Sequence, residues 1–360
     1  MNLNGFRNSL IIKTKVVNNM EAPNIKVIKI SVVVIAYERK KFIKEALLSV
    51  LNQTIARNQY EIICIVGFKD EIISKFLKEN DITEIYCRCK IGKNISIGLN
   101  SCKGDYVVFL EDDDKFTRNK LEQILKAFGN NNIIYYHNNY EIIDKDSRIL
   151  NSKQVKIKSF HRQFNHSTLW NPPHNYHRIT KYGGGFNLSS MVVSRTHIIK
   201  YSSVLAKIEL AADFIVFFLL LQDNLSFFFD TNRTTLYRIH ENSETHSISR
   251  DQKDLIDHSS QEYRSVLMLY ESLKSVESKK ILLQSLLSSK FHAYVAGCKD
   301  LKPSFIEVVK FLYIGLTTLN LSYLMILIAT VVYGMFPKYI DKLAVIRESK
   351  RYNVFFKNNK

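Results

Sequence analysis

From Lys29 to Leu110 the sequence alternates short apolar runs with amphipathic segments, and this alternation constrains the fold more than any other feature. The apolar runs cover residues 29–37, 60–66, 84–89 and 105–110, and their near-continuous apolar character is typical of strands covered on both faces. Residues 40–53, 70–80 and 94–102 lie between them and are predicted to be helices, the first with apolar residues at clear helical spacing. Strands alternating with helices predict an α/β fold, with a parallel sheet and right-handed crossovers.

A cluster of acids ends the fourth predicted strand. It consists of Glu111, Asp112, Asp113 and Asp114. Ligands of parallel sheets bind beyond the carboxyl ends of the strands, so we expect the acids, Tyr37 and residues 66–69 along one edge. Adjacent carboxylates repel one another, and hard divalent cations such as Mg²⁺ or Mn²⁺ prefer oxygen ligands. The sequence therefore predicts a cation site at this edge, with a solvated acidic turn as the alternative.

Composition and charge narrow the class of partner. Hydrophobic residues make up 46% of the 360, enough for one large domain or two ordinary ones. With 51 Lys and Arg against 34 Asp and Glu, the formal charge of +17 suits anionic lipid, phosphorylated small molecules or nucleic acid. The basic residues are scattered and no nucleic-acid-binding motif occurs, so we expect no nucleic-acid partner. No GxGxxG follows the first predicted strand, which argues against a dehydrogenase.

The cysteines and the first residues indicate a cytosolic compartment. Five cysteines without a secretory signal are expected to be reduced, including Cys87 and Cys89 in the third predicted strand, which have no second Cys or His pair at metal spacing. Residues 1–28 lack a proper apolar core and a small-residue cleavage site. We interpret them as a polar N-terminal extension.

The rest of the chain is less regular. Residues 187–194 predict a strand after the glycine-rich loop 181–186, residues 209–222 a buried helix that opens with acids, and residues 233–240 a strand. Residues 251–289 are predicted to be helical. This pattern divides the chain into an extension (1–28), an α/β domain (29–240), a helical region (241–300) and apolar helices with a basic tail (301–360).

Three blocks of this sequence resemble the opening of inverting family 2 glycosyltransferases with the GT-A fold. They are SVVVIAYERKKFIKEALLSVLNQT, YEIICIV and GKNISIGLNSCKGDYVVFLEDDDKF, whose order and spacing match over residues 29–116, with weaker matches as far as His240. The resemblance implies a Rossmann-like, mostly parallel sheet flanked by helices, with a nucleotide-binding half (29–116) and an acceptor half (117–240). It further implies transfer of a sugar from a nucleotide-diphosphate donor to an acceptor hydroxyl, with a divalent cation as cofactor.

The resemblance assigns the strand-end acids to the donor and its metal. FLEDDD stands in the place of the family's DxD-type motif, so Asp113 would coordinate the metal that bridges to the donor diphosphate. Asp112 and Glu111 would support the ribose and the ion. His240, in a segment similar to the family's late YRxH, would contact phosphate or complete the metal site.

The resemblance also implies a nucleobase pocket, and this sequence departs from the family there. Ala36, Tyr37 and Glu38 match the loop against which the base packs. Val66 and Gly67 replace the family's paired acids, and the nearby Asp70 is the expected substitute. The family's ARNxG pattern is altered to NISIG, which ends at Gly98. The departures leave the identity of the nucleotide open.

A catalytic base is the remaining requirement, because an attacking hydroxyl must lose its proton. The resemblance places this base at Asp213, with Ala212 where the family usually has glutamate and with Glu209 as the fallback. The apolar run after Asp213 is expected to raise its pKa, and an acid that only stabilises a helix N-terminus is the alternative. Gly184 and Gly185, in the glycine-rich loop, are expected on the acceptor side.

The segment from Phe305 to Phe336 is strongly apolar and is followed by a basic tail. It is long enough to span a bilayer, which needs about 20 residues, but a span would place the basic tail outside a cytosolic enzyme. We therefore expect two apolar helices on or in the inner leaflet, with a single span or a soluble helical lid as alternatives. A membrane-associating extension at the cytoplasmic face suits a lipid-linked acceptor.

Two other functions stay open. A nucleotidyltransferase also uses strand-end acids and a divalent ion, but AYERKKF lacks the glycine of its phosphate loop. A non-catalytic sugar- or lipid-binding protein of the same fold is consistent with the loss of acids at Val66 and Gly67. The presence of both Asp113 and Asp213 argues against it.

Overall fold

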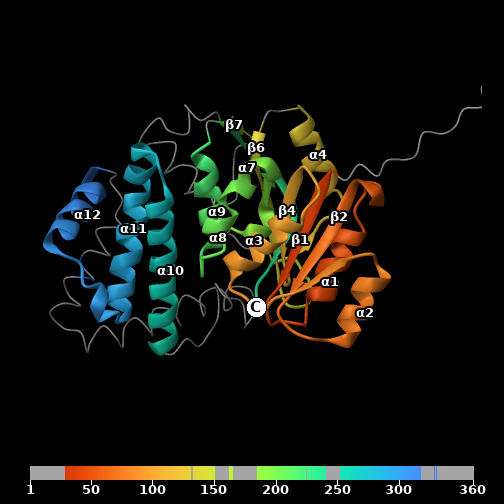
Figure 1. Ribbon diagram of the computed structural model, residues 1–360, viewed down its shortest axis with the longest axis horizontal. Coiled ribbons are helices and arrows are strands. Elements are labelled where there is room, and N and C mark those ends of the chain that lie inside the picture. Colours follow the sequence, from red (N-terminus) through yellow and green to blue (C-terminus); the bar gives the residue numbers. More distant parts are fainter. Residues whose placement is uncertain are drawn as a thin grey trace, which may run out of the picture.

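The computed structural model describes residues 29–130, 133–150, 162–164, 185–223, 225–240 and 252–317, with Ile328 and Thr330. The strands are β1 (Ile30–Ala36), β2 (Tyr60–Val66), β3 (Thr83–Tyr86), β4 (Tyr106–Glu111), β5 (Lys115–Phe116), β6 (Ile133–Ile143), β7 (Arg162–Phe164), β8 (Met191–Ser194) and β9 (Ser226–Arg238). The helices are α1 (Ile43–Leu51), α2 (Glu71–Glu79), α3 (Ile91–Ser101), α4 (Lys120–Asn130), α7 (Arg195–Ile198), α8 (Ser202–Leu205), α9 (Ala212–Leu221), α10 (Gln252–Ser272), α11 (Val276–Ala296) and α12 (Phe305–Thr317). Helices cover both faces of one sheet, which confirms the predicted α/β fold (Figure 1).

Within the described residues the sheet has nine strands in the order β3-β2-β1-β4-β8-β6-β9-β5, with β7 paired to β9. The four strands predicted from the alternation are parallel: β1 pairs with β2 and β4, and β2 pairs with β3. The other half is mixed, since β8 runs antiparallel to β4 and β6 while β6 and β9 are parallel. Ala36 lies opposite Val66 and Ile35 opposite Glu111, so β1, β2 and β4 end at one level.

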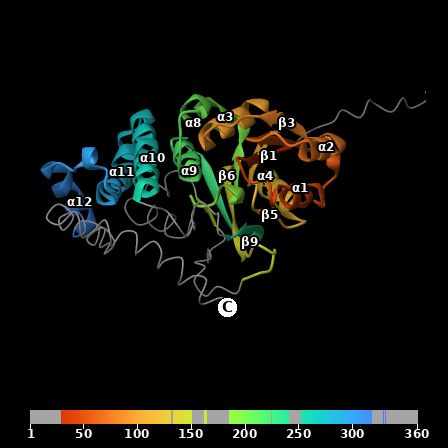
Figure 2. The same ribbon diagram turned by 90° about the horizontal axis from the view of Figure 1, so that it is seen from below.

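The parallel strands are buried on both faces, as their continuous apolar sequences predict. Val32 and Val34 of β1 face a core shared with α1, α2 and α4, whereas Val33 and Ile35 face a core shared with α3 and α9. Figure 2 shows α3, α8 and α9 on one side of the sheet, with α1 and α4 on the other. Successive side chains of a strand point to opposite faces, so both cores draw on the same strand.

The C-terminal helices continue the core that lies beneath α9. Leu269 of α10 and Leu282 and Leu286 of α11 belong to the same buried cluster as Ile215 of α9. The helical region is therefore packed against the α/β domain through a shared core, and α9 lies between the sheet and α10 (Figure 1).

Helix α12 packs on α11 and exposes apolar side chains. Phe311 stacks on Phe291, with ring centroids 4.6 Å apart, whereas Phe305 is 81% exposed and Tyr313 is 68% exposed. In the part of the chain that the structure describes, no helix combines the length and the apolarity needed to cross a membrane. Most of the apolar stretch that follows α12 lies outside the described residues.

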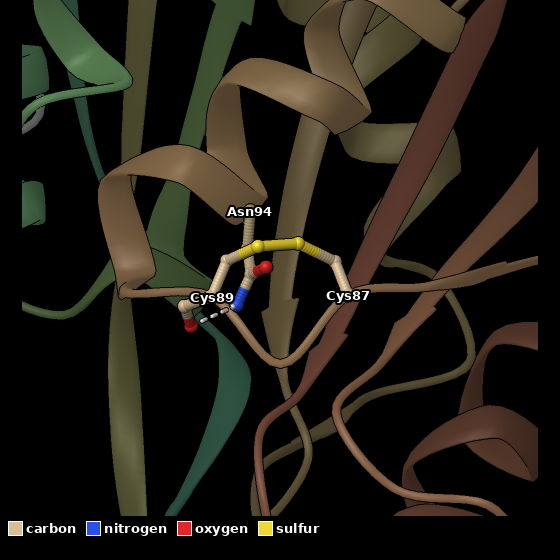
Figure 3. Close-up of a disulfide and its surroundings, with 3 residues drawn as sticks. All are labelled: Cys87, Cys89 and Asn94. Carbon is tan, nitrogen blue, oxygen red and sulfur yellow. Dashed lines mark hydrogen bonds between the residues drawn. A yellow bond between two sulfur atoms is a disulfide. The ribbon is translucent and has the colours of Figure 1, made fainter.

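The third predicted strand is shorter than expected and its cysteines are not reduced. Strand β3 ends at Tyr86, and Cys87 and Cys89 form a disulfide in the loop before α3, with Cα atoms 5.3 Å apart (Figure 3). Asn94 of α3 donates from Nδ2 to the carbonyl of Cys89 at 3.1 Å. The expectation of a strand up to residue 89 was wrong because the chain turns there to enter α3, and this turn brings the two thiols together.

Candidate active site

The acidic cluster forms a tight turn at the carboxyl end of β4. The amide of Asp112 donates to the carbonyl of Ile35 at 3.1 Å, and the amide of Asp114 donates to that of Glu111 at 3.2 Å. On the other side the amide of Arg238 donates to Asp114 Oδ1 at 2.9 Å. Hydrogen bonds to β1 and β9 therefore fix the turn, and three aspartates are buried there at the edge predicted from the sequence.

Arg39, which the sequence analysis did not single out, joins two of these acids. Its Nη2 donates to Asp112 Oδ1 and its Nη1 lies by Asp113 Oδ2, both at 2.7 Å. Burial opposes the charge on the guanidinium, but the fields of Asp113, Asp112 and Glu111 outweigh it and raise the pKa of Arg39 above its usual value. The AYERKKF loop after β1 carries four charged side chains, and only the fold shows which one turns toward the acids.

The surroundings of the four acids shift their pKa values in different directions. Burial raises the pKa of Asp112 to about 7 against the charge of Arg39, and burial together with Asp113 raises the pKa of Asp114 to about 8. Burial, with the charges of Asp113 and Asp114, also raises the pKa of Glu111 well above its usual value. Burial acts on Asp113 too, but the hydrogen bond with His240 and the charge of Arg39 outweigh it and lower its pKa. Asp113 is therefore the acid most firmly ionised at neutral pH.

The end of β9 supports this turn with two buried side chains. His240 Nε2 lies 3.1 Å from Asp113 Oδ2, and its ring lies 4.9 Å from that of Phe42. Arg238, which is 1% exposed, donates from Nε to the carbonyl of Asp113 at 2.7 Å and from Nη2 to Glu45 Oε2 at 3.0 Å. The structure thus brings the predicted His240 to the predicted Asp113, and adds Arg238 as a positioning residue.

The turn has oxygen atoms that suit a divalent cation. Asp112 Oδ2 and Asp114 Oδ2 are buried and have no hydrogen-bond partner among the described residues. No group of three or more His, Cys, Asp or Glu side chains in the described ranges is arranged to hold a metal by itself. Mg²⁺-type sites often use only one or two carboxylates and complete their shell with substrate phosphates and water. These residues therefore fit a cation that arrives with a diphosphate.

The loops after β1 and β2 carry the residues that the resemblance predicts to border a nucleobase. Ala36 is buried, Tyr37 is 41% exposed at the rim, and Glu38 accepts from Arg88 Nη2 at 2.7 Å. A Cβ on Gly67 would lie 2.1 Å from the carbonyl oxygen of Tyr37. The two loops approach so closely that no side chain fits at Gly67 in this arrangement of the backbone.

Asp70 and Gly98 have structural roles that the sequence analysis did not predict. Asp70 Oδ1 accepts from the amides of Ile72 and Ile73 at 3.1 Å and caps α2, while its Oδ2 pairs with Lys40 at 3.0 Å. The bond from Lys40, followed by that from the Ile73 amide, lowers the pKa of Asp70. Gly98 lets α3 pack against β1, because a Cβ there would lie 2.5 Å from a methyl of Val33. A contact of either residue with the donor stays a prediction.

Asp213 lies in the first turn of α9, as predicted. Its Oδ2 accepts from the amide of Asn187 at 3.0 Å and its Oδ1 from the amide of Phe214 at 2.8 Å. Its negative charge contributes to the raised pKa of Glu111, after burial and the nearer charges, so the two carboxylates share one electrostatic environment. Its proposed fallback, Glu209, is paired with Arg264 through two contacts of 3.3 Å.

The glycine-rich loop is described only at its end. Gly184 lies outside the described residues, whereas Gly185 packs against Phe217 of α9, where a Cβ would lie 3.2 Å from the ring. Gly185 therefore allows the chain before Asn187 to run close to the helix that carries Asp213. Its role toward an acceptor stays a prediction.

Comparison with known proteins gives three findings. Residues 31–183 match the family model described as Glycosyl transferase family 2. An uncharacterized glycosyltransferase of Rickettsia bellii is 34% identical over 140 residues, which are 38% of this chain and 20% of that protein. The UDP-Glc:alpha-D-GlcNAc-diphosphoundecaprenol beta-1,3-glucosyltransferase WfgD of Escherichia coli is 30% identical over 123 residues, 33% of this chain and 48% of WfgD. The chain thus spans less than half the length of each.

A solved structure confirms the fold over a longer part of the chain. S. aureus TarS 1–349, crystallised in complex with UDP-GlcNAc, superposes with a TM-score of 0.55 at 15% identity. The match covers 78% of this chain and 77% of that one. At this identity the similarity concerns the fold alone, and it agrees with the predicted GT-A arrangement.

Proposed function

We propose that this chain, whose residues 31–183 match the model of glycosyl transferase family 2, is an inverting glycosyltransferase that uses a nucleotide-diphosphate sugar. The observation that carries the proposal is the buried turn of acids at the level ends of β1, β2 and β4, with Asp213 in the same electrostatic environment. A nucleotidyltransferase gains no support from the family match.

We assign binding of the sugar-nucleotide donor to the acidic turn at the end of β4. Asp113, with Asp112 and Asp114 beside it, would hold a divalent cation such as Mg²⁺ or Mn²⁺ together with the diphosphate, and such an ion offsets the charge of a diphosphate leaving group. The buried oxygens Asp112 Oδ2 and Asp114 Oδ2 support this assignment, as does the ionised state of Asp113. Tyr37 and Glu38 would border the nucleobase at the rim.

Asp213 is assigned as the general base. As the acceptor oxygen forms its bond to the anomeric carbon, the bond from that carbon to the diphosphate breaks, and the hydroxyl proton passes to the carboxylate of Asp213. The nucleoside diphosphate leaves from the opposite face, which inverts the anomeric configuration. The amides of Asn187 and Phe214 hold the carboxylate in place for this transfer.

The acceptor is proposed to be a lipid-linked saccharide at the cytoplasmic face of the cell membrane. Three observations support this location: the exposed apolar side chains of α12, the apolar sequence that continues to Phe336, and the basic residues after it. Apolar helices with flanking Lys and Arg bind anionic membrane surfaces. WfgD, by its name, uses a diphosphoundecaprenol-linked GlcNAc, which makes a carrier of this class the first acceptor to test.

The test is calorimetric titration of nucleoside diphosphates and nucleotide sugars, with and without Mn²⁺, against the wild type and Asp113→Asn. We expect one nucleotide to bind in a metal-dependent manner, with the binding lost in the variant. Proton NMR of the transfer product then determines the anomeric configuration. Binding of no nucleotide under either condition, or retention of configuration, would contradict the proposal.

A further inference from the structure

Three aromatic side chains from separate segments form a group for which the proposed chemistry has no use. They are Tyr140 of β6, Phe186 before the 3₁₀ turn Leu188–Ser190, and Tyr237 of β9. Their ring centroids lie 5.8 Å apart for Tyr140 and Phe186, 5.6 Å for Tyr140 and Tyr237, and 5.7 Å for Phe186 and Tyr237. The rings are inclined to one another by 55° to 72°, so they pack tilted or edge to face rather than as a flat stack.

Two of these three aromatic residues are next in the chain to residues that contact the predicted site acids. Phe186 directly precedes Asn187, whose amide binds Asp213 at 3.0 Å, and Tyr237 directly precedes Arg238, which binds Asp113 and Asp114. Consecutive Cα atoms are about 3.8 Å apart, so the Cα atoms of Phe186 and Tyr237 are each that far from the Cα atom of a residue that positions a predicted site acid. Phe186 and Tyr237 are therefore chain neighbours of residues that hold predicted site acids, and the ring of Tyr140 packs against both.

Hydrogen bonds and strand pairing hold the backbone that carries the rings. Buried His137 donates from Nε2 to the carbonyl of Phe186 at 2.7 Å, and β6 pairs with β9 through Tyr140 opposite Thr235 and Ile142 opposite Tyr237. A ligand that binds to such a surface costs little ordering of the protein, which is the property a binding platform needs.

Their exposure distinguishes these rings from the core aromatics of the same strand. Tyr135 and Tyr136 of β6 are 0% exposed, whereas Tyr140, Phe186 and Tyr237 are all only partly buried. Half-buried aromatic groups with fixed faces are typical of ligand pockets, where an apolar ring face gives area and neighbouring polar groups give orientation. A pyranose has the matching chemistry, with an apolar C–H face and hydroxyls around its edge.

We propose that Tyr140, Phe186 and Tyr237 form the platform on which the acceptor saccharide lies, so that its hydroxyl reaches Asp213. The inference rests on the proposed function and adds the residues that select and orient the acceptor. The ligand class is a saccharide ring presented by its C–H face, with its attached diphosphate or lipid directed away from the platform.

The experiment uses the full chain and separates the acceptor from the donor. Saturation-transfer NMR, with irradiation of aromatic protons, measures contact with octyl glucoside, octyl galactoside, octyl N-acetylglucosaminide and an alkyl GlcNAc-α-diphosphate. The variants are Phe186→Leu and Tyr237→Leu, with Tyr237→Phe to keep the ring and Tyr106→Leu as the matched control. Tyr106 is half-buried against Phe128, with centroids 4.1 Å apart, at the amino end of β4 and away from the site.

We expect at least one probe to receive saturation from wild-type rings, and each Leu variant in the platform to raise its Kd by about 5-fold or more, the scale of one lost aromatic contact. Tyr237→Phe and Tyr106→Leu should retain wild-type affinity. Nucleotide titration by calorimetry should be unchanged in all four variants. This pattern supports the platform even if transfer itself is not observed.

Two outcomes overturn the platform. One is the absence of saturation transfer from wild-type rings to every probe, and the other is wild-type saccharide affinity in both Phe186→Leu and Tyr237→Leu. If the proposed function is wrong, the result is different: no nucleotide binds to the wild type, whether or not the saccharide probes receive saturation.

Discussion

Replacing Arg39 with glutamine removes the cation that joins two buried acids, and we expect a divalent ion to compensate for it. Removing one partner of a buried ion pair typically costs 3–5 kcal/mol. The Arg39 side chain is 29% exposed, although Asp112 is 1% exposed. Solvent screening of the exposed part reduces the expected loss to about 2–3 kcal/mol. Because the α/β domain and the helices packed on it form one unit of roughly 300 residues, that loss lowers Tm by about 3–5 °C.

The assay is thermal unfolding followed by circular dichroism, in EDTA and in excess Mn²⁺, with Mn²⁺ affinity measured by calorimetry. In the wild type Arg39 occupies Asp112 Oδ1 and Asp113 Oδ2, so a metal must share or displace these contacts. In Arg39→Gln these oxygens are released. We therefore expect Mn²⁺ to bind the variant more tightly and to restore most of its lost Tm, since an ion at 100 times its Kd contributes about 2.7 kcal/mol.

Lys40→Gln is the control, because Lys40 lies next in the chain but pairs with Asp70 at the surface. We expect no resolvable change in Tm or in Mn²⁺ affinity for this variant. An equal Mn²⁺ effect on wild type and Arg39→Gln, or an Arg39 variant as stable in EDTA as the wild type, would show that the guanidinium does not stand in for the metal.

Three further predictions concern the base, the acids and α12. Asp213→Asn should lower kcat about 10²- to 10⁴-fold, the usual effect of removing a general base, while calorimetry shows unchanged nucleotide affinity. The pKa of Asp114 is raised from 3.8 to about 8, so in this pH range the native state keeps a proton that the unfolded chain has lost. Its contribution therefore destabilises the fold as pH rises, and urea unfolding should show Asp114→Asn gaining stability over the wild type from about pH 4 to pH 8; a constant difference would refute this. Phe305→Asp with Tyr313→Asp should reduce sedimentation with anionic lipid vesicles without changing nucleotide binding, and unchanged sedimentation would exclude α12 as the contact.

The sequence predicted the parallel half of the sheet well, because alternating strands and helices leave few topologies. The resemblance predicted that Asp113 and His240 belong to one site, and in the structure His240 Nε2 lies 3.1 Å from Asp113 Oδ2. Arg39 and Arg238 were missed because the chain has 51 Lys and Arg residues, and only tertiary packing determines which of them contact the acids. The pairing of Cys87 with Cys89 was also missed, because it depends on a turn in the chain rather than on a local pattern.

The core shared by α9, α10 and α11 has a consequence for the support of the helix that carries Asp213. Asp213 lies on α9, α9 packs with Leu269 of α10 and Leu282 of α11, and α11 contacts α12 through Phe291. Helix α11 therefore contributes to two buried clusters, one shared with α9 and α10 and the other with α12. A chain cut after His240 would lack α10 and α11, so the apolar residues of α9 that pack against these helices would be exposed.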